Sequence, residues 1–355
     1  MTTFSEIKES ISQELSDLNR TIREALSSNC SLLNTVVDTY LETKGKQIRP
    51  IITILCAKFF SGVNEAVIYG AAAVELLHNA SLIHDDVIDE SKTRRGKATV
   101  NSIWDNHVAV LAGDFFVSKA LKCAIKTGDF RVISSIGTLG ETLSTGELDQ
   151  IDIAKHHTIN EQNYYSIISR KTASLFRSCV EVGGYAAKAS DSDIENLGRY
   201  VEMLGLCFQI RDDIFDYFDS KEVGKPTGND LREGKATLPL VYALSKDTPQ
   251  AKEMRKIFEK ERLTDDEIAT LIEFAKSSGG IDYAYSEMER IGAEAAQILA
   301  QYPDSEAKTA FLSLFQFITK RQKKCYCLIL LRDASKQGAT RRDADAWRVR
   351  SLLRL

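Results

Sequence analysis

The chain has little of several features that would point to other classes of protein. Its 355 residues include only five prolines, which are thinly scattered and leave room for long helices. Its seven cysteines stand mostly alone in apolar stretches, lack zinc-ligand spacing and are odd in number. We therefore expect reduced thiols and a cytoplasmic protein. No sustained alternation of apolar and polar residues indicates a sheet or a domain boundary, so we predict a single all-α domain.

Charge and hydropathy exclude further classes. With 46 basic and 50 acidic residues the formal net charge is −4, so no nucleic-acid footprint is indicated. The first sixteen residues are polar and show no signal-peptide core. No apolar run approaches the ~20 residues of a membrane span, and we expect no transmembrane segment. The 43% of hydrophobic residues is ordinary for a globular protein with a large core.

An acidic cluster follows an apolar run that favours helix. If the helix continues, Asp85 and Asp89 lie four residues apart on one face, with Asp86 turned about 100° away. Such carboxylates repel each other unless a cation lies among them, and oxygen ligands alone suit Mg²⁺, which completes its shell with substrate phosphate. Arg94 and Arg95 follow, and guanidinium groups suit phosphate oxygens. One cluster alone could also be a solvated helix end.

A second cluster repeats the spacing. Asp212, Asp213 and Asp216 also follow an apolar run. Two DDxxD clusters on apolar helices are hard to explain as surface, because buried carboxylates need partners, and two facing clusters could share several metal ions. The paired motifs, with the two arginines after the first, resemble those of the trans-prenyltransferases, the all-trans polyprenyl diphosphate synthases. The resemblance covers roughly residues 30–324.

This resemblance implies a fold and a reaction. The fold would be an isoprenoid-synthase-type bundle of ten or more helices around a central cavity, spanning residues 1–324 and forming a homodimer. The reaction would be the Mg²⁺-dependent head-to-tail condensation of isopentenyl diphosphate onto an allylic diphosphate, which needs no side-chain nucleophile. The implied metal ligands are Asp85, Asp89 and Asp212, with Asp86, Asp213 and Asp216 in support.

The resemblance also implies substrate contacts. The segment from Gly45 to Pro50 is similar to the family's Gly-Gly-Lys-Arg-x-Arg-Pro motif, but it has one glycine and carries Gln47 in place of a frequent Arg. The residues implied to hold isopentenyl diphosphate are Lys46, Arg49, His78 and Arg95. Those implied to hold the allylic diphosphate are Arg94, Lys171, Thr172, Gln209, Lys225 and Lys235. Lys171 also joins Asp85 and Asp212 in the catalytic set. On spacing alone, these cations could simply be solvated and the histidine a core residue.

Two small residues bear on product length. Ala80 and Ser81 lie one turn before Asp85, roughly 6–7.5 Å along the helix axis, and a prenyl chain held at the aspartates must grow past them. Because both side chains are small, we predict a hexaprenyl to decaprenyl product of the kind that becomes a quinone side chain. The two residues could also merely allow close helix packing.

Other functions were weighed against this one. The chain could be a short-chain farnesyl or geranylgeranyl diphosphate synthase, or a non-catalytic subunit of a heteromeric prenyl synthase. A non-catalytic subunit should have degraded one aspartate cluster, and both are intact. A terpene cyclase commonly lacks the second DDxxD and the loop with Lys46 and Arg49.

The C-terminal stretch does not resemble a continuation of the fold. The basic residues up to Lys324 fit the short tail with which family members tend to end, yet an apolar segment follows at 325–331. From Cys325 onward seven basic residues stand against three acidic ones, a net charge of +4. We interpret residues 325–355 as an extension without catalytic role. The alternative is a membrane-surface helix, with peripheral membrane contact for product release.

Overall fold

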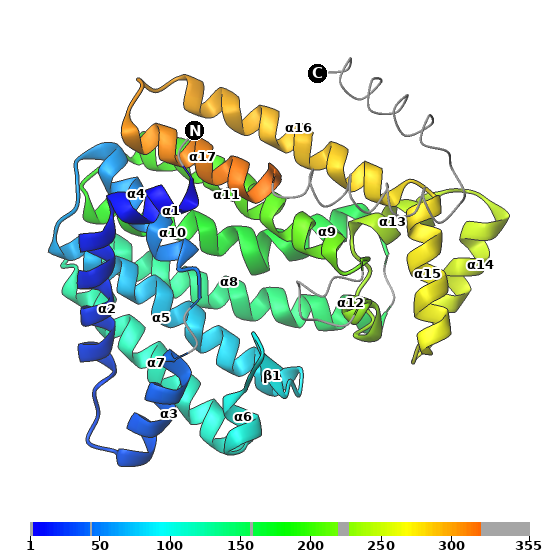
Figure 1. Cartoon of the computed structure of the whole chain (residues 1–355), viewed down its shortest axis with the longest axis horizontal. Coiled ribbons are helices and arrows are strands. Elements are labelled where there is room, and N and C mark those ends of the chain that lie inside the picture. Colours follow the sequence, from blue (N-terminus) through cyan, green and yellow to red (C-terminus); the bar gives the residue numbers. More distant parts are fainter. Residues whose placement is uncertain (1–2, 43–44, 157–158, 219–226, 321–355) are drawn as a thin grey trace, which may run out of the picture.

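The computed structural model describes residues 3–42, 45–156, 159–218 and 227–320, and in them the chain is helical almost throughout (Figure 1). The first helices are α1 (Phe4–Ser10), α2 (Ser12–Leu26), α3 (Ser31–Leu41), α4 (Ile48–Phe60), α5 (Glu65–Ile88), α6 (Val100–Ile103), α7 (Asn106–Lys126) and α8 (Phe130–Lys155). The others are α9 (Glu161–Ile168), the π-helical turn η1 (Ser169–Ala173), α10 (Ser174–Ala186), α11 (Asp191–Phe215), α12 (Asn229–Arg232), α13 (Leu238–Ser245), α14 (Pro249–Phe258), α15 (Asp265–Ser277), α16 (Gly280–Ala300) and α17 (Glu306–Lys320). The prediction of an all-α bundle is confirmed, while the boundary predicted at residue 324 and the segment 325–355 lie outside the described residues.

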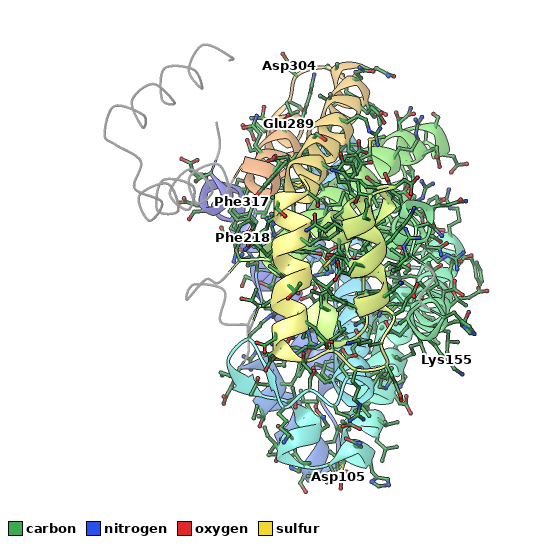
Figure 2. The ribbon with its side chains drawn as sticks, turned by 90° about the vertical axis from the view of Figure 1, so that its right-hand side faces the viewer. Asp105, Lys155, Phe218, Glu289, Asp304 and Phe317 are labelled. Atoms are coloured by element: carbon green, nitrogen blue, oxygen red, sulfur yellow. The ribbon has the colours of Figure 1, made fainter. Side chains whose placement is uncertain are left out.

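The middle of the bundle is built around α10. It packs against α4, α5, α8 and α11, and α11 packs in turn against α16 and α17 (Figure 1). The helices α13, α14 and α15 contact one another at one end of the molecule. Figure 2 looks from that end and shows Asp105, Lys155 and Asp304 at the rim. These charged side chains lie on the outside of the bundle, whereas α10 and α11 lie in its middle.

Helix α5 is apolar around most of its circumference. Such a helix belongs in the interior of a protein or in a membrane, and α5 has the length and composition of a membrane span, which the sequence analysis did not recognise. Most of its apolar window (61%) is buried in the protein, among α4, α7 and α10. In the described part of the chain it is the one helix that meets these criteria, and its surroundings are those of a core helix.

The structure corrects the expectation that no strands occur. Thr93–Arg94 pairs with Lys97–Ala98 in an antiparallel hairpin. The turn residues Arg95 and Gly96 both have positive φ, 54° and 75°, as a two-residue type I′ turn requires. Strands of two residues are too short to show an alternating pattern. The hairpin fixes the direction of the two arginines that follow the first aspartate cluster.

We expect Gly183→Ala to weaken the contact between α4 and α10. A Cβ atom at Gly183 would lie 2.5 Å from the backbone oxygen of Thr53, which cannot yield as a flexible side chain can. Thermal or denaturant unfolding should show a loss of about 1–3 kcal/mol in the free energy of unfolding.

The matched control is Gly198→Ala on α11, where a Cβ would meet only the Arg177 side chain at 3.8 Å. This change should be neutral or stabilise by up to about 1 kcal/mol through helix propensity. Equal stability of the two variants would contradict the close approach of α4 and α10.

Candidate active site

The first aspartate cluster lies at the carboxyl end of α5. Asp85 and Asp86 belong to its last turn, and Asp89 is the C-cap residue. The carboxyl end of a helix carries partial negative charge, so carboxylates there are disfavoured. Burial raises the pKa of Asp85 to about 6; nearby Lys171 opposes this shift, and Glu147 and Asp89 add to it. The cluster thus has more negative charge than its own helix can stabilise.

Arg94 faces this cluster. Its Nε and its Nη2 atom both lie 2.8 Å from Oδ1 of Asp86, a side chain that is almost fully buried. The loop that carries Arg94 is held down by Asn101, whose amide donates to the backbone oxygens of Asp86 and Ser91 at 3.1 and 3.2 Å. Arg94 was predicted as an allylic-diphosphate contact, and the structure places it on the second aspartate of the first motif.

The second cluster lies at the carboxyl end of α11, and its three aspartates have different surroundings. Asp212 is the accessible one, with its side chain 42% exposed and Arg211 2.8 Å away. Asp213 is buried and accepts hydrogen bonds on both oxygens, from Tyr164 at 2.6 Å and Gln209 at 2.7 Å. Asp216 accepts from two backbone N–H groups at the start of α12, each at 3.0 Å. In this state, Asp212 has the carboxylate most available to a ligand.

A π-helical turn presents Lys171 and Thr172 between α8 and α11. Such turns insert one residue into a helix and occur often at functional sites. Lys171 forms an ion pair with Glu147 and donates to Gln150 Oε1 at 3.0 Å, both on α8. Thr172 donates to Gln209 on α11 at 2.7 Å. One cation, Lys171, and two amides, Gln150 and Gln209, therefore meet between η1, α8 and α11.

Glycines allow the π-helical turn to lie this close to its neighbours. A Cβ atom at Gly205 of α11 would lie 2.8 Å from the Cα of Ala173. One at Gly146 of α8 would lie 2.9 Å from the Cβ of Arg170. The approach of η1 to both helices thus depends on residues without side chains.

A second group of charges surrounds His78 on α5. Burial and the guanidinium groups of Arg49 and Arg95 hold the pKa of His78 well below its usual value, so the imidazole is neutral. Burial raises the pKa of Glu75, and the same two arginines oppose that shift. The Nε of Arg49 is buried without a hydrogen-bond partner. A buried donor left unpaired among positive groups suits an anion.

Gly45, which precedes α4 in the segment from Gly45 to Pro50, has a specific contact. A Cβ atom at Gly45 would lie 2.5 Å from an Nη atom of Arg95, so the guanidinium group of the hairpin packs against this backbone. The one glycine that the motif retains is therefore the one that Arg95 requires. Lys46 lies with its Nζ 5.8 Å from the ring centroid of Phe317 on α17.

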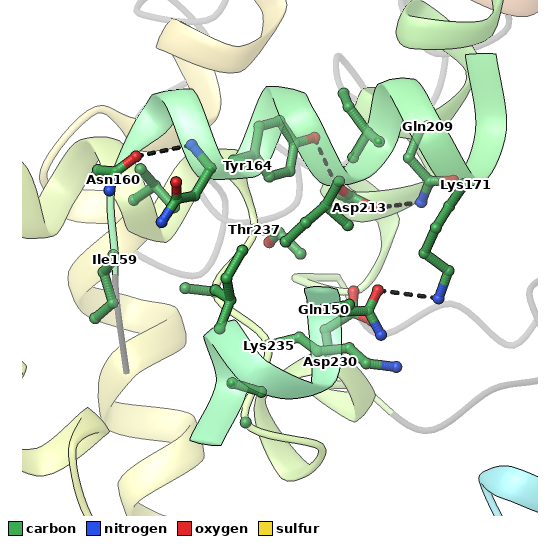
Figure 3. A pocket seen from close by; sticks show the side chains of 18 of the residues that line it. Gln150, Ile159, Asn160, Tyr164, Lys171, Gln209, Asp213, Asp230, Lys235 and Thr237 are labelled. Atoms are coloured by element: carbon green, nitrogen blue, oxygen red, sulfur yellow. Dashed lines mark hydrogen bonds between the residues drawn. The ribbon is translucent and has the colours of Figure 1, made fainter. Parts of the chain in front are cut away.

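A cavity of about 200 Å³ adjoins η1 (Figure 3). Four predicted contacts for the allylic diphosphate line it: Lys171, Thr172, Gln209 and Lys235. Lys235 pairs with Glu233 at 2.5 Å, and Asp89 and Asp230 help to raise its pKa, while burial opposes the shift. The structure therefore brings four of the six predicted contacts together. Arg94 lies on the first cluster, and Lys225 lies outside the described residues.

Several site residues escaped the sequence analysis. Glu147 and Gln150 were not among the predicted site residues, yet they hold Lys171. Glu75 stands three residues before His78, a Glu-x-x-His spacing found in di-iron helical bundles, but the sequence has no second such pair. Tyr164 gave no signal, because a lone tyrosine within an amphipathic helix is common. One feature of the sequence could have drawn attention to Glu147. The residue before it, Gly146, is a glycine within a helix, and it lies where α8 approaches η1 closely.

The donors suit a divalent metal that is shared with substrate. All of them are carboxylate oxygens, which Mg²⁺ prefers. In residues 3–42, 45–156, 159–218 and 227–320, no three His, Cys, Asp or Glu side chains converge to form a complete metal site. Mg²⁺ commonly binds through one or two carboxylates, several waters and substrate phosphates. The observed arrangement fits that mode and does not fit a closed structural metal cage.

Comparison with known proteins identifies the family. Residues 30–275 match the polyprenyl synthetase family. The chain is 31% identical to the octaprenyl diphosphate synthase of Escherichia coli (strain K12) over 318 residues, which cover 89% of this chain and 98% of that protein. The chain therefore belongs to the polyprenyl synthetase family. It is a prenyltransferase of the polyprenyl diphosphate synthase type.

Two solved structures are similar along almost their whole length. A polyprenyl synthase from Caulobacter crescentus CB15, complexed with calcium and isoprenyl diphosphate, has a TM-score of 0.84 at 30% identity, covering 90% of this chain and 98% of that one. A geranylgeranyl pyrophosphate synthase from Bacteroides thetaiotaomicron has a TM-score of 0.77 at 36% identity, covering 89% and 98%. The fold is thus the all-α fold of the isoprenyl diphosphate synthases.

We predict that Asp85→Asn stabilises the metal-free protein at neutral pH. The folded-state pKa of about 6 lies above the ordinary value of 3.8, so the folded protein binds more protons between these values than the unfolded chain. Stability must therefore fall as pH rises from about 4 to 7. In EDTA at pH 7.5 the variant should gain about 1–2 kcal/mol in unfolding free energy, after allowance for solvent screening.

The gain should shrink to roughly a third at pH 4.5, where Asp85 is protonated in the folded protein while the unfolded chain, with its ordinary pKa of 3.8, is still mostly ionised. Chemical unfolding at the two pH values measures this difference. A wild type that is more stable than the variant at pH 7.5 would show that Lys171 already compensates the carboxylate.

Proposed function

We propose that this protein adds isopentenyl diphosphate repeatedly to an allylic diphosphate and releases a long-chain all-trans polyprenyl diphosphate, a precursor of quinone side chains. The observation that best supports this proposal is the pairing of acid and base at one place. Asp85 and Asp89 of α5 interact electrostatically with Lys171 of η1, and Asp89 also with Lys235. Carboxylates that need cations and lysines that suit phosphate are the two requirements of a metal–diphosphate complex.

In this proposal the metal is Mg²⁺. Asp85, Asp89 and Asp212 would hold it, and it would neutralise charge on the leaving diphosphate when bound. The supporting roles differ. Asp86 orients Arg94, Asp213 anchors Gln209, and Asp216 caps α12, so these three shape the site around the ligands.

The chain's own residues then bind and orient two substrates. Lys171, Thr172, Gln209 and Lys235 hold the allylic diphosphate, while Lys46, Arg49, His78 and Arg95 hold isopentenyl diphosphate. The allylic C–O bond breaks, and diphosphate leaves with the electron pair. The isopentenyl double bond attacks the allylic cation and forms the new C–C bond. Loss of a proton to the departing diphosphate restores a double bond, which makes the product the next allylic substrate.

The proposed product length rests on the small side chains of α5 one turn before Asp85. Ala80 is 1% exposed, and the Ser81 hydroxyl turns back to donate to the carbonyl of His78 at 2.9 Å. Neither side chain extends from α5 as an aromatic residue would. The octaprenyl synthase relative supports a long product. The geranylgeranyl synthase with a similar structure keeps a short product as the alternative.

A homodimer is proposed from the outer face of α7 and α8. These helices carry most of the exposed large apolar side chains that the structure describes: Val110, Leu111, Val117, Leu121, Ile125, Phe130, Leu148 and Ile151. Phe130 is 87% exposed. An apolar face of this kind marks an interaction site, and a second copy in two-fold symmetry is its commonest partner. A cytoplasmic location is proposed from the five cysteines in the described part of the chain, which are all free thiols, four of them buried.

Loss of a metal-binding carboxylate should abolish turnover. With Mg²⁺, farnesyl diphosphate and radiolabelled isopentenyl diphosphate, we expect wild-type protein to form labelled polyprenyl diphosphate. Asp85→Ala or Asp212→Ala should cut turnover by at least about 10³-fold, since the leaving-group charge is no longer stabilised. Asp304→Ala is the control, because this aspartate pairs with Lys308 on the surface. Near-normal turnover of Asp85→Ala and Asp212→Ala at saturating Mg²⁺ would make the clusters structural.

Ala80→Tyr should shorten the product. A ring one turn below Asp85 would block the path of the growing chain and shift the product to about fifteen or twenty carbons, while the first condensation continues. Chromatographic sizing of the labelled products measures this shift, and circular dichroism checks the fold. If wild-type protein itself stops at farnesyl or geranylgeranyl diphosphate, other side chains set the length and the short-chain alternative holds.

Charged substitutions on the outer face of α7 test the proposed dimer. In light scattering, the wild type should have the mass of a dimer, and Leu111→Glu with Leu121→Glu should give a monomer. Leu312→Glu is the control, because it adds the same charge to an exposed leucine of α17. A monomeric wild type would contradict the proposal. A chain that is inactive until a second polypeptide is added would instead support the heteromeric alternative.

A further inference from the structure

Tyr164 donates a hydrogen bond to Asp213 but has been given no role toward substrate. It comes from α9, is 5% exposed, and lines the cavity beside Asp213 (Figure 3). We propose that Tyr164 is a positioning residue that fixes Thr172 through Asp213 and Gln209. The proposal rests on the proposed function, because its readout is the binding of the allylic diphosphate.

Four side chains form one continuous chain of hydrogen bonds. The hydroxyl of Tyr164 donates to Oδ2 of Asp213 at 2.6 Å. The amide nitrogen of Gln209 donates to Oδ1 of the same carboxylate at 2.7 Å. Its amide oxygen accepts from the hydroxyl of Thr172 at 2.7 Å. The chain joins α9 and the η1 turn that directly follows it to α11, which lies further along the sequence.

The chemistry of the carboxylate sets the direction of this chain. Both oxygens of Asp213 accept in the structure, so Gln209 turns its NH₂ group toward the carboxyl group and its carbonyl toward Thr172. The hydroxyl proton of Thr172 then points to Gln209, and its lone pairs remain for a donor in the cavity. The orientation of Thr172 is therefore decided two residues away, at the carboxylate that Tyr164 holds.

Among the residues that the structure describes, Tyr164 is the one hydroxyl donor to Oδ2 of Asp213. Without it, a buried carboxyl oxygen is left without this partner, and leaving a buried polar atom unpaired is costly. Asp213 would then be free to rotate toward other donors, and Gln209 would lose the fixed partner that orients its amide. The effect should reach Thr172 before it reaches the charges around His78, because among the described residues no hydrogen bond joins Arg49, His78 or Arg95 to this chain.

The neighbouring residue offers a matched control. Tyr165 lies on the same helix, and its ring packs edge-on to that of Tyr164 with centroids 5.5 Å apart. Its hydroxyl, however, donates to Glu287 on α16 at 3.2 Å. Tyr164→Phe and Tyr165→Phe each remove one hydroxyl group from α9. A difference in substrate binding between the two variants would therefore come from the hydrogen-bond partner that is lost, Asp213 or Glu287.

The experiment measures the KM of each substrate and the binding of an unreactive allylic thiodiphosphate by calorimetry. Tyr164→Phe should raise the KM for the allylic diphosphate and raise the Kd of the thiodiphosphate analogue about ten-fold. The KM for isopentenyl diphosphate should not change. Tyr165→Phe should change none of these values. Thr172→Val should resemble Tyr164→Phe, and the double variant should add little to either, since both changes interrupt one chain.

Three results would overturn the proposal: equal behaviour of the two tyrosine variants, an equal rise in both KM values, or additive losses in the double variant. If Tyr164→Phe does not fold, Gln209→Met combined with Thr172→Val tests the same chain by the same additivity. A wild type that makes no polyprenyl diphosphate would contradict the proposed function. An active wild type with unaffected Tyr164→Phe would contradict this inference alone.

Discussion

The constraint on which the site depends is the concentration of carboxylates at the ends of two long helices. Asp85 and Asp212 lie where the partial charge of α5 and α11 is already negative. Burial raises the pKa of Asp85 to about 6, so the ionised form is costly in the protein alone. Lys171 and Lys235 compensate part of this charge. A divalent cation with its diphosphate would compensate the rest, which makes an unfavourable local arrangement useful for binding.

The close packing of helices serves the same purpose. Because Gly205 and Gly146 lack side chains, η1 can approach α11 and α8 closely enough for Lys171 to meet Glu147 and for Thr172 to meet Gln209. The group of charges around His78 is built differently, from the start of α4, from α5 and from the hairpin whose turn carries Arg95 against Gly45. The two groups share α5 and the hairpin, which carries Arg94 to the first aspartate cluster and Arg95 to the charges around His78.

The sequence predicted the features that lie within single helices. The aspartate spacing could be found because it depends on neighbours in sequence, and Lys171 was predicted from its similarity to a family motif. The partners could not be found: Tyr164 and Asp213 are 49 residues apart, and only the structure shows Glu75 buried beside two arginines. The different roles of the three aspartates in the second cluster also required the structure, since Asp216 caps a helix thirteen residues further on. Long-range hydrogen bonds leave no local pattern to read.

The most direct test of this account is the coupling between metal and diphosphate. Calorimetric titration of inorganic pyrophosphate in the presence and absence of Mg²⁺ measures it, because coupling is reciprocal between two ligands. We predict weak binding of either ligand alone and binding at least about 100-fold tighter when both are present, with the coupling lost in Asp85→Ala. Tight Mg²⁺ binding without pyrophosphate, or equal pyrophosphate binding in EDTA, would contradict the claim that the carboxylates form an incomplete site completed by substrate.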